Sequence, residues 1–201
     1  KVFYTERSET YIEIDDNLEI LSNNELVLPS EKDGFKHLYL LDLNGQTHQI
    51  TKGNWDVIDF YGVNEKDRMV YYSSSENGAI NKSIFKISLN GKNKKQISTT
   101  NGYSEAEFST GMNYFIKTYS TANTPNQYTL CNNQGVELFK IEDNNKLSAT
   151  LKNYHLSPKE FFKINAAPHS LAGRCRCKPI LNYSQPILNH SEPILNQCKP
   201  F

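Results

Sequence analysis

Thiol and imidazole side chains gather near the end of this 201-residue sequence, where they could bind zinc. Three of its four cysteines, Cys175, Cys177 and Cys198, lie there together with His169 and His190. Zinc prefers such ligands, but structural zinc sites usually place about two to four residues between their first two cysteines. A single residue separates the first two cysteines of this group. We therefore interpret them as unstructured thiols and assign no metal site.

The remaining histidines and the fourth cysteine form no pattern typical of catalysis. His37 and His48 flank an expected hairpin, and His155 lies in an expected loop. None of them has a serine and an acid beside it in a context typical of a catalytic triad. Cys131 stands alone among the expected strands, so no disulfide is expected to hold the strands together. We assign no catalytic residue and no cofactor.

Acidic and basic clusters indicate turns and solvated strands. Asp15, Asp16 and Asp42 could suggest calcium, but they lack the dense acidic loop that a calcium site requires, so we predict that they cap turns. The 22 basic and 22 acidic residues give a formal net charge of zero, which argues against a nucleic-acid-binding surface. The lysines within Lys92–Lys95 are interpreted as part of a solvated strand. Trp55 is expected to pack between sheets rather than to bind a ligand.

The elements that position these residues are marked by a turn that occurs three times. Leu43-Asn44-Gly45, Leu89-Asn90-Gly91 and Asn133-Gln134-Gly135 begin 46 and then 44 residues apart. A repeat of roughly 40–50 residues with four short strands is typical of a β-propeller blade. The repeats supply about three blades, and a closed ring generally needs at least about four. The chain is therefore expected to be part of a larger ring.

The middle repeat shows how each blade is expected to be built. Asp56–Tyr61 and Met69–Tyr72 are rich in β-branched and aromatic residues and predict a first hairpin with its turn at Asn64–Asp67. Ser83–Leu89 alternates apolar and polar side chains, as a strand with one buried face does. Asn90-Gly91 predicts a hairpin turn with positive φ at both residues, followed by a lysine-rich edge strand.

The other two repeats show the same order of strands. These strands are expected at Leu18–Leu21, Glu25–Leu28, His37–Leu43, Thr47–Ile50, Ala106–Phe108, Asn113–Tyr119, Gln127–Leu130 and Val136–Ile141. No part of the repeats has a sustained helical period. We therefore predict an all-β fold: a partial β-propeller of about three four-stranded antiparallel blades, with a disordered or irregular C-terminal tail.

Three segments are expected along the chain. Residues 1–145 form the partial propeller, residues 146–165 form a connecting segment, and residues 166–201 form a tail. A short helix is expected to begin at Asn144 or Asn145 and to run to Lys152.

The tail repeats Pro-Ile-Leu-Asn every seven residues, starting at Pro179, Pro186 and Pro193. Proline removes a backbone donor and clashes with the preceding turn, so a continuous helix is excluded. An extended or disordered tail is expected. Our hypothesis is that the reading frame is disrupted, or the gene truncated, near residue 166.

Eight segments within residues 8–165 carry a resemblance to a known family: Ser30–Tyr39, Asp42–Gly45, Ile50–Val57, Val70–Tyr72, Ala122–Pro125, Tyr128–Leu130, Leu138–Asn144 and Ser157–Ile164. Together they closely resemble the propeller of the dipeptidyl peptidase IV family, within the prolyl oligopeptidase clan. The resemblance implies the last three of that family's eight blades. It also implies a serine exopeptidase that removes N-terminal dipeptides ending in Pro or Ala, whose propeller admits only unfolded peptide ends. After Ala167 the sequence departs from the family.

The resemblance carries over no catalytic or substrate-binding residue. The family's nucleophile lies in Gly-x-Ser-x-Gly, on a sharp turn that exposes the serine beside the oxyanion-hole amides, and no such pentapeptide occurs in this sequence. The resemblance implies that the partner Asp and His belong to an absent hydrolase domain. It also implies that the paired glutamates that hold the substrate amine lie in an earlier blade. Glu6–Tyr11 is expected to border the peptide channel of the intact family.

Two functions follow from these interpretations. The first is a fragment of a dipeptidyl peptidase that carries part of the substrate-gating propeller and is inactive alone. The alternative is a non-enzymatic interaction module, in which open blade edges pair with another chain to give a homo-oligomer. Peptide substrates are expected only in the intact family context.

Location and processing are expected only by analogy. The family's members are exported, which suggests a periplasmic or cell-surface protein. The sequence starts at Lys1 without a signal peptide, as expected of an internal or processed segment, and has no apolar run of about 18 residues that would cross a bilayer. The sequons at Asn81, Asn182 and Asn189 matter only if the source glycosylates its proteins.

Overall fold

The structure is a computed structural model that describes residues 2, 4–9, 11–12, 15–99, 101–154 and 156–161. The chain divides into two units, Lys1–Pro158 and Lys159–Phe201, and all the described strands belong to the first. The Pro-Ile-Leu-Asn repeats, the last three cysteines and the sequons in the tail lie outside the described residues. So do His155, His169 and His190.

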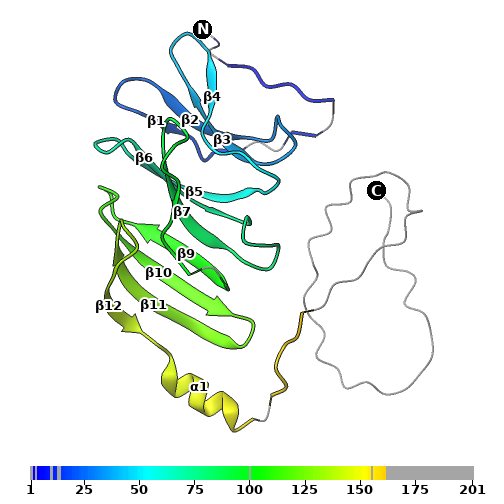
Figure 1. Cartoon of the computed structure of the whole chain (residues 1–201), viewed down its shortest axis with the longest axis vertical. Coiled ribbons are helices and arrows are strands. Elements are labelled where there is room, and N and C mark those ends of the chain that lie inside the picture. The colour runs from blue at the N-terminus through cyan, green and yellow to red at the C-terminus, as the bar shows by residue number, and fades with distance from the viewer. Residues whose placement is uncertain are drawn as a thin grey trace, which may run out of the picture. The chain divides into compact units, whose positions relative to one another are not determined.

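Twelve strands of the described chain form three four-stranded antiparallel sheets, each with its strands side by side in chain order (Figure 1). The first sheet contains β1 (Glu19–Ile20), β2 (Leu26–Ser30), β3 (His37–Leu41) and β4 (Thr47–Gln49). The second contains β5 (Val57–Asn64), β6 (Met69–Ser74), β7 (Ser83–Ser88) and β8 (Lys95–Gln96). The third contains β9 (Tyr103–Phe108), β10 (Tyr114–Thr121), β11 (Thr124–Asn132) and β12 (Glu137–Glu142). The predicted all-β partial β-propeller of three four-stranded blades is confirmed.

The second hairpin of each sheet closes with the same turn. The amides of Gly45, Gly91 and Gly135 each donate to the carbonyl three residues earlier, at 3.0, 2.8 and 2.9 Å. Each glycine has a positive φ, of 82°, 75° and 83°, which glycine adopts without steric cost. Asn90 is not among the described residues with positive φ, so the prediction of positive φ at both residues of Asn90-Gly91 is wrong. A hairpin loop in which a turn leads into a left-handed glycine needs positive φ at the glycine alone.

The first hairpin of each sheet also repeats, although its residues do not. Asn24, Arg68 and Met112 have φ values of 64°, 50° and 53° and lie 44 residues apart. The amide of each donates to the carbonyl three residues earlier, at 2.8, 3.3 and 2.8 Å. An amide, a guanidinium and a thioether share no turn chemistry. The backbone conformation of this turn is therefore repeated in all three sheets, although its side chains differ.

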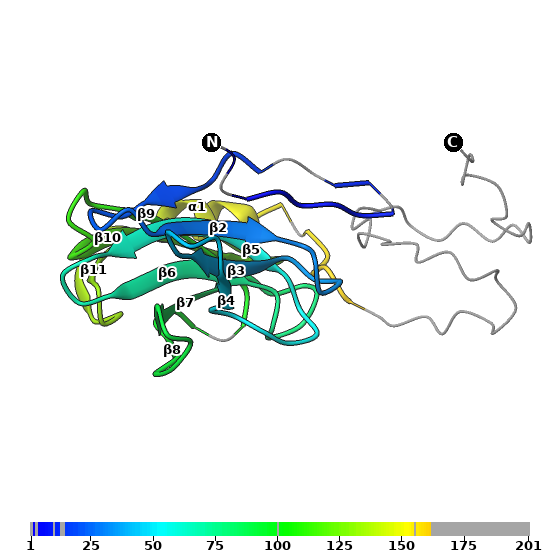
Figure 2. The ribbon, with the colours of Figure 1, turned by 90° about the horizontal axis from the view of Figure 1, so that it is seen from above.

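The second sheet is covered on both faces, and the three sheets overlie one another when the chain is seen from above (Figure 2). Successive side chains of a strand point to opposite faces of its sheet. On one face, Val70 and Tyr72 of β6 pack in a cluster with Leu38 of the first sheet. On the other face, Tyr71 packs in a cluster with Phe115 of the third sheet. All five side chains are at most 1% exposed. The three sheets therefore pack face to face, with the second sheet in the middle.

The predicted helix is confirmed as α1 (Asn145–Lys152), which follows β12 directly. Its preceding residue, Asn144, has a φ of 54° and ends the extended chain of the third sheet. Within the described part of the chain, no helix has both the length and the apolar character that a membrane span requires.

Candidate functional site

The first strands of neighbouring sheets are joined by hydrogen bonds between side chain and backbone. Glu19 Oε2 on β1 accepts the amide of Val63 on β5 at 2.9 Å. The Tyr61 hydroxyl on β5 accepts the amide of Ala106 on β9 at 3.3 Å. Because propeller blades surround a central channel, the strands that converge in this way are the ones that a ligand in the channel would meet. This junction is the candidate functional site.

Lys82 links the second and third sheets at the junction. Its Nζ lies 2.6 Å from Asp59 Oδ2 on β5 and 2.9 Å from Glu105 Oε1 on β9. It also lies 4.8 Å from the centre of the Tyr103 ring. The Lys82 side chain is 3% exposed, whereas those of Asp59 and Glu105 are 38% and 50% exposed. A buried ammonium without partners would be costly, so the two carboxylates are what stabilise the lysine there.

The groups of this cluster shift one another's pKa values and so fix which of them are charged. Burial alone would raise the pKa of the Asp59 carboxyl, but hydrogen bonds from Lys82 and Ser73 outweigh it and the pKa lies below its usual value. Burial would lower the pKa of Lys82, but its bonds to Asp59 and Glu105 raise that pKa above its usual value. Burial, and then the charge of Asp59, raises the pKa of Tyr61 well above its usual range. At neutral pH Asp59 is therefore a carboxylate, Lys82 an ammonium and Tyr61 a neutral phenol.

The cluster offers hydrogen-bond acceptors rather than a nucleophile. The partly exposed carboxylates of Asp59 and Glu105 exceed the ammonium by one negative charge, so they can accept from the N–H groups of a peptide. The hydroxyl of Ser73, a serine that contacts the cluster, is fully buried and donates to Asp59 Oδ2 at 2.8 Å. That serine is therefore occupied by the carboxylate and closed to a substrate.

An equivalent ion pair lies one repeat earlier. Lys36 pairs with Asp15, and these residues precede Lys82 and Asp59 by 46 and 44 residues, the interval of the turns. Sequence reasoning missed this repeat of a lysine with an aspartate, although its spacing could have shown it. Asp15 Oδ1 also accepts the amide of Asn17 at 3.0 Å, which confirms that Asp15 caps a turn.

His37, the histidine at the start of β3, is a fully buried structural residue. Its Nε2 lies 3.0 Å from the carbonyl of Gly53 and its Nδ1 lies 3.1 Å from Thr51 Oγ1. Because a carbonyl only accepts, Nε2 carries the proton and Nδ1 accepts from the threonine hydroxyl. The ring meets Trp55 edge-on at 4.8 Å between centroids, and Trp55 stacks on Tyr72 of the second sheet at 6.2 Å. The prediction that Trp55 packs between sheets is confirmed.

The other candidate residues serve turns, core or surface. Asp42 Oδ1 accepts the amides of Asn44 and Gln46 at 2.9 and 2.8 Å, so the predicted turn cap at Asp42 is confirmed. Cys131 is buried on β11, and burial raises the pKa of its thiol. His48 is exposed on β4.

The predicted solvated strand and one predicted sequon are also described. All the lysines within Lys92–Lys95 are exposed, and β8 is the outer strand of its sheet, as predicted. Lys94 pairs with Glu76 at 2.5 Å. The Asn81 side chain accepts the amide of Gly102 at 2.9 Å through Oδ1, so this sequon asparagine is part of a folded loop.

Glu6, in the segment expected to border the peptide channel, is bound to the first sheet. Its Oε1 accepts the Ser30 hydroxyl at 2.7 Å, and its Oε2 accepts the Tyr4 hydroxyl at 3.1 Å. Tyr11, at the other end of that segment, is 85% exposed. That Glu6–Tyr11 borders a channel stays a prediction.

Similarity to known proteins agrees with this architecture. A family model described as the dipeptidyl peptidase IV (DPP IV) N-terminal region matches residues 1–126. The probable dipeptidyl peptidase 4 of Aspergillus flavus is 27% identical over 162 residues, which are 74% of this chain and 21% of that protein. The dipeptidyl peptidase 4 of Trichophyton rubrum is 28% identical over 143 residues, which are 67% of this chain and 18% of that protein.

A solved structure matches the fold itself. The crystal structure of Porphyromonas gingivalis dipeptidyl peptidase 4 is similar with a TM-score of 0.76 and 37% sequence identity, over 81% of this chain and 23% of that one. The chain thus spans about a fifth of the length of the relatives that it matches. The family model covers well over half of its residues, and the three sheets follow the same architecture as the solved relative. The chain belongs to the dipeptidyl peptidase IV family, as part of its N-terminal region.

Proposed function

We propose that this chain forms part of the substrate-gating propeller of a dipeptidyl peptidase and does not cleave peptides by itself. One observation carries the proposal: three successive four-stranded sheets match the P. gingivalis peptidase with a TM-score of 0.76. The family resemblance supplies the reaction, the release of N-terminal dipeptides that end in Pro or Ala. The nucleophile and its partners are proposed to lie in other parts of a longer protein.

In this proposal the junction of the inner strands has two roles. Lys82 holds the second and third blades together through its two carboxylate partners, and so fixes part of the channel wall. The exposed parts of Asp59 and Glu105 add negative potential to that wall, which favours the approach of a positively charged peptide N-terminus.

The non-catalytic part of the proposal is tested with the chain itself. Purified chain is incubated with Gly-Pro p-nitroanilide, and release of p-nitroaniline is followed by absorbance. We expect no release above that of buffer. Hydrolysis that follows the chain through two different chromatographic steps would overturn this part of the proposal.

The propeller part is tested by exchange. Residues 1–158 replace the matched segment of the P. gingivalis peptidase, and a chimaera rebuilt from that enzyme's own segment with the same junctions is the control. We expect the exchanged chimaera to hydrolyse Gly-Pro p-nitroanilide. A folded chimaera without activity, beside an active control, would contradict the proposal.

A further inference from the structure

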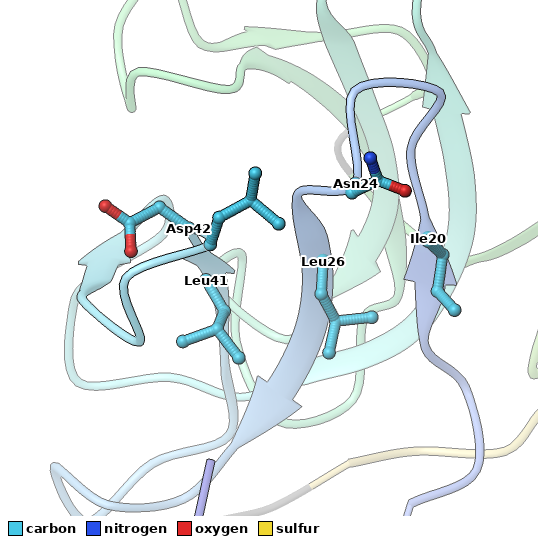
Figure 3. Close-up of a pocket in the computed structure, with 6 residues that line it drawn as sticks. Ile20, Asn24, Leu26, Leu41 and Asp42 are labelled. Carbon is cyan, nitrogen blue, oxygen red and sulfur yellow. The ribbon is translucent and has the colours of Figure 1, made fainter. Parts of the chain in front are cut away.

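The apolar pocket of the first sheet lies where a neighbouring blade would pack (Figure 3). It has a volume of about 320 Å³, and Leu26 and Leu41 are among the side chains that line it. Val70, which follows Leu26 by 44 residues, is fully buried between the first and second sheets. Exposure on the first and third sheets thus depends on which blades are present, whereas the second sheet has a neighbour on each face.

On the second sheet, the pairing of β5 with β6 is irregular on both sides of Asp59. The register shifts between Val57 and Asp59 and again between Phe60 and Gly62. The first strands of the other two sheets, β1 and β9, pair with their neighbours without such a shift. Bulges in a strand redirect side chains and are common next to active sites. The irregular backbone of β5 is therefore centred on Asp59.

Three donors converge on one oxygen of the Asp59 carboxylate. Its Oδ2 lies 2.6 Å from Lys82 Nζ, 2.8 Å from the Ser73 hydroxyl and 3.2 Å from the Tyr61 hydroxyl. Ser73 Oγ also accepts the Asp59 amide at 3.0 Å, so the side chain and its backbone are held together. Supporting hydrogen bonds of this kind hold a functional group in the orientation that a ligand needs.

The other oxygen, Oδ1, accepts no hydrogen bond from the residues that the structure describes. The Asp59 side chain is 38% exposed, although Lys82 and Ser73 are almost fully buried. Because Oδ2 lies among these buried donors, the exposed part of the carboxylate is the oxygen that they leave free. Burial would raise the pKa of this carboxyl, but the bonds from Lys82 and Ser73 lower it below its usual value. Oδ1 is therefore an exposed anionic acceptor at neutral pH.

A single free oxygen selects the kind of cation that it binds. A guanidinium pairs best with a carboxylate through two parallel hydrogen bonds, and one of the two oxygens of Asp59 is already occupied. A primary ammonium is a compact charge, for which one acceptor oxygen is enough. Peptides carry this group at a free N-terminus and at the end of a lysine side chain.

We propose that Asp59 Oδ1 binds a primary ammonium group of a peptide in the channel, and that Lys82, Ser73 and Tyr61 are positioning residues. A directed acceptor does more than add negative potential to the wall, because it distinguishes an ammonium from a guanidinium. The inference deepens the proposed function and rests on it for the place of Asp59 in a channel wall. Binding itself needs no hydrolase domain, so it can be measured on the chain alone.

The test is a titration of the isotope-labelled full chain with short peptides, followed by nuclear magnetic resonance shifts of its amides. Acetyl-Ala-Lys-Ala-amide carries only a side-chain ammonium, and Ala-Ala-Ala-amide carries only an N-terminal one. Acetyl-Ala-Arg-Ala-amide carries a guanidinium, and the norleucine analogue of the lysine peptide carries no charge.

We expect at least one of the two ammonium peptides to shift the amides of residues 58–60 in a saturable way. The peptide that does so shows whether the ammonium comes from an N-terminus or from a lysine. The arginine peptide should bind at least about threefold more weakly than that peptide, and the norleucine peptide should cause no saturable shift.

Asp59→Asn keeps the shape of the side chain and removes its charge, so it should weaken ammonium binding at least about fivefold. Lys82 keeps a charged partner in this variant, because Glu105 still pairs with it. Asp67→Asn is the matched control, since it removes the same charge at an exposed position in the β5–β6 turn. This control should bind the peptide like the wild-type chain.

Tyr61→Phe tests the positioning role. It removes one of the three donors from Oδ2, so the carboxylate is less firmly held and its preference for the ammonium peptide over the arginine peptide should fall. A loss of stability alone would not change this ratio in the chains that remain folded. An unchanged ratio would remove Tyr61 from the positioning residues.

Asp59→Glu keeps the charge but moves the free oxygen, and should weaken ammonium binding at least about threefold. It serves as the second variant if near-ultraviolet circular dichroism shows that Asp59→Asn does not fold. Three results would each overturn the proposal: no saturable shift with either ammonium peptide, equal binding of the arginine peptide, or unchanged binding by Asp59→Glu. None of them bears on the activity of the chimaera, which tests the proposed function separately.

Discussion

Lys82, directly before β7, forms an ion pair with Glu105 on β9 at 2.9 Å and so ties the second sheet to the third. Its other partner, Asp59 at 2.6 Å, belongs to its own sheet. The lysine is almost fully buried, whereas both carboxylates reach solvent. Removing each of the three groups should therefore change the stability of the folded chain by a different amount. Loss of the lysine leaves two carboxylates without a cation, whereas loss of Glu105 leaves the lysine still paired.

Lys82→Met should therefore destabilise the chain by about 2 kcal/mol, less than for a fully buried pair because the carboxylates are partly hydrated. Glu105→Gln should cost less than this, because Asp59 still neutralises the lysine. Urea unfolding followed by Trp55 fluorescence measures both. Lys66→Met, at an exposed position in the β5–β6 turn, is the matched control and should stay within about 0.5 kcal/mol of wild type. Equal effects of the two lysine changes would contradict this assignment.

Glu19→Gln should stabilise the chain at pH 7 and have little effect at low pH. Burial, and then the charge of Glu65, raises the pKa of the Glu19 carboxyl despite the hydrogen bond from the Val63 amide. The folded chain therefore binds the proton more tightly than the unfolded chain, so stability is lost as pH rises from the usual pKa of a glutamate through the raised pKa of the folded chain. Glutamine mimics the protonated form and still accepts the amide. Urea midpoints measured between about pH 3.5 and 7 check this, with Glu107→Gln on β9 as the exposed control.

Thr51→Val should destabilise the chain by about 2 kcal/mol, because it removes a hydroxyl that serves two buried groups. Thr51 Oγ1 accepts the amide of Leu38 at 2.9 Å and lies 3.1 Å from His37 Nδ1. Valine keeps the shape and leaves both groups without a partner. Thr51→Ser keeps the hydroxyl and should cost less than about 1 kcal/mol. Equal urea midpoints for the two variants would show that the hydroxyl contributes nothing.

Gly135→Ala should be more costly than Gly78→Ala, although both glycines have positive φ, of 83° and 108°. Backbone strain of about 1 kcal/mol applies to each. The added methyl at position 135 would lie 2.5 Å from the Ile97 carbonyl oxygen, whereas at position 78 the nearest atom is the Asn81 side-chain nitrogen at 3.6 Å. We expect the difference in unfolding free energy to exceed about 1 kcal/mol. A smaller difference would mean that the sheets shift apart freely.

Features carried by one stretch of chain could be predicted from the sequence. The glycine at each second hairpin turn follows a chemical rule, so spacing of Gly45, Gly91 and Gly135 was enough to give the blade length. The first hairpin turns could not be found in this way, because Arg68 and Met112 are residues that rarely adopt positive φ. The pairing of the strands on either side offsets their strain, and that pairing cannot be seen in the identity of the turn residues.

Features that need two blades were missed for the same reason. The partners of Lys82 lie 23 residues before it and 23 residues after it, on two different sheets. Only the stacking of those sheets brings the three charges together. The repeat of the Asp15–Lys36 pair at Asp59 and Lys82 was visible in the spacing, but the approach of Glu105 was not.

The double cover of the second sheet sets the order in which the molecule opens. Amides of β6 and β7 lie beneath neighbours on both sides, so solvent reaches them only when the whole stack comes apart, whereas β1 and β12 can fray on their own. Amide hydrogen exchange should therefore be slowest in β6 and β7 and faster toward each end. In a deuterated solvent, the amide protons retained longest should therefore be those of the middle blade, because this blade opens last.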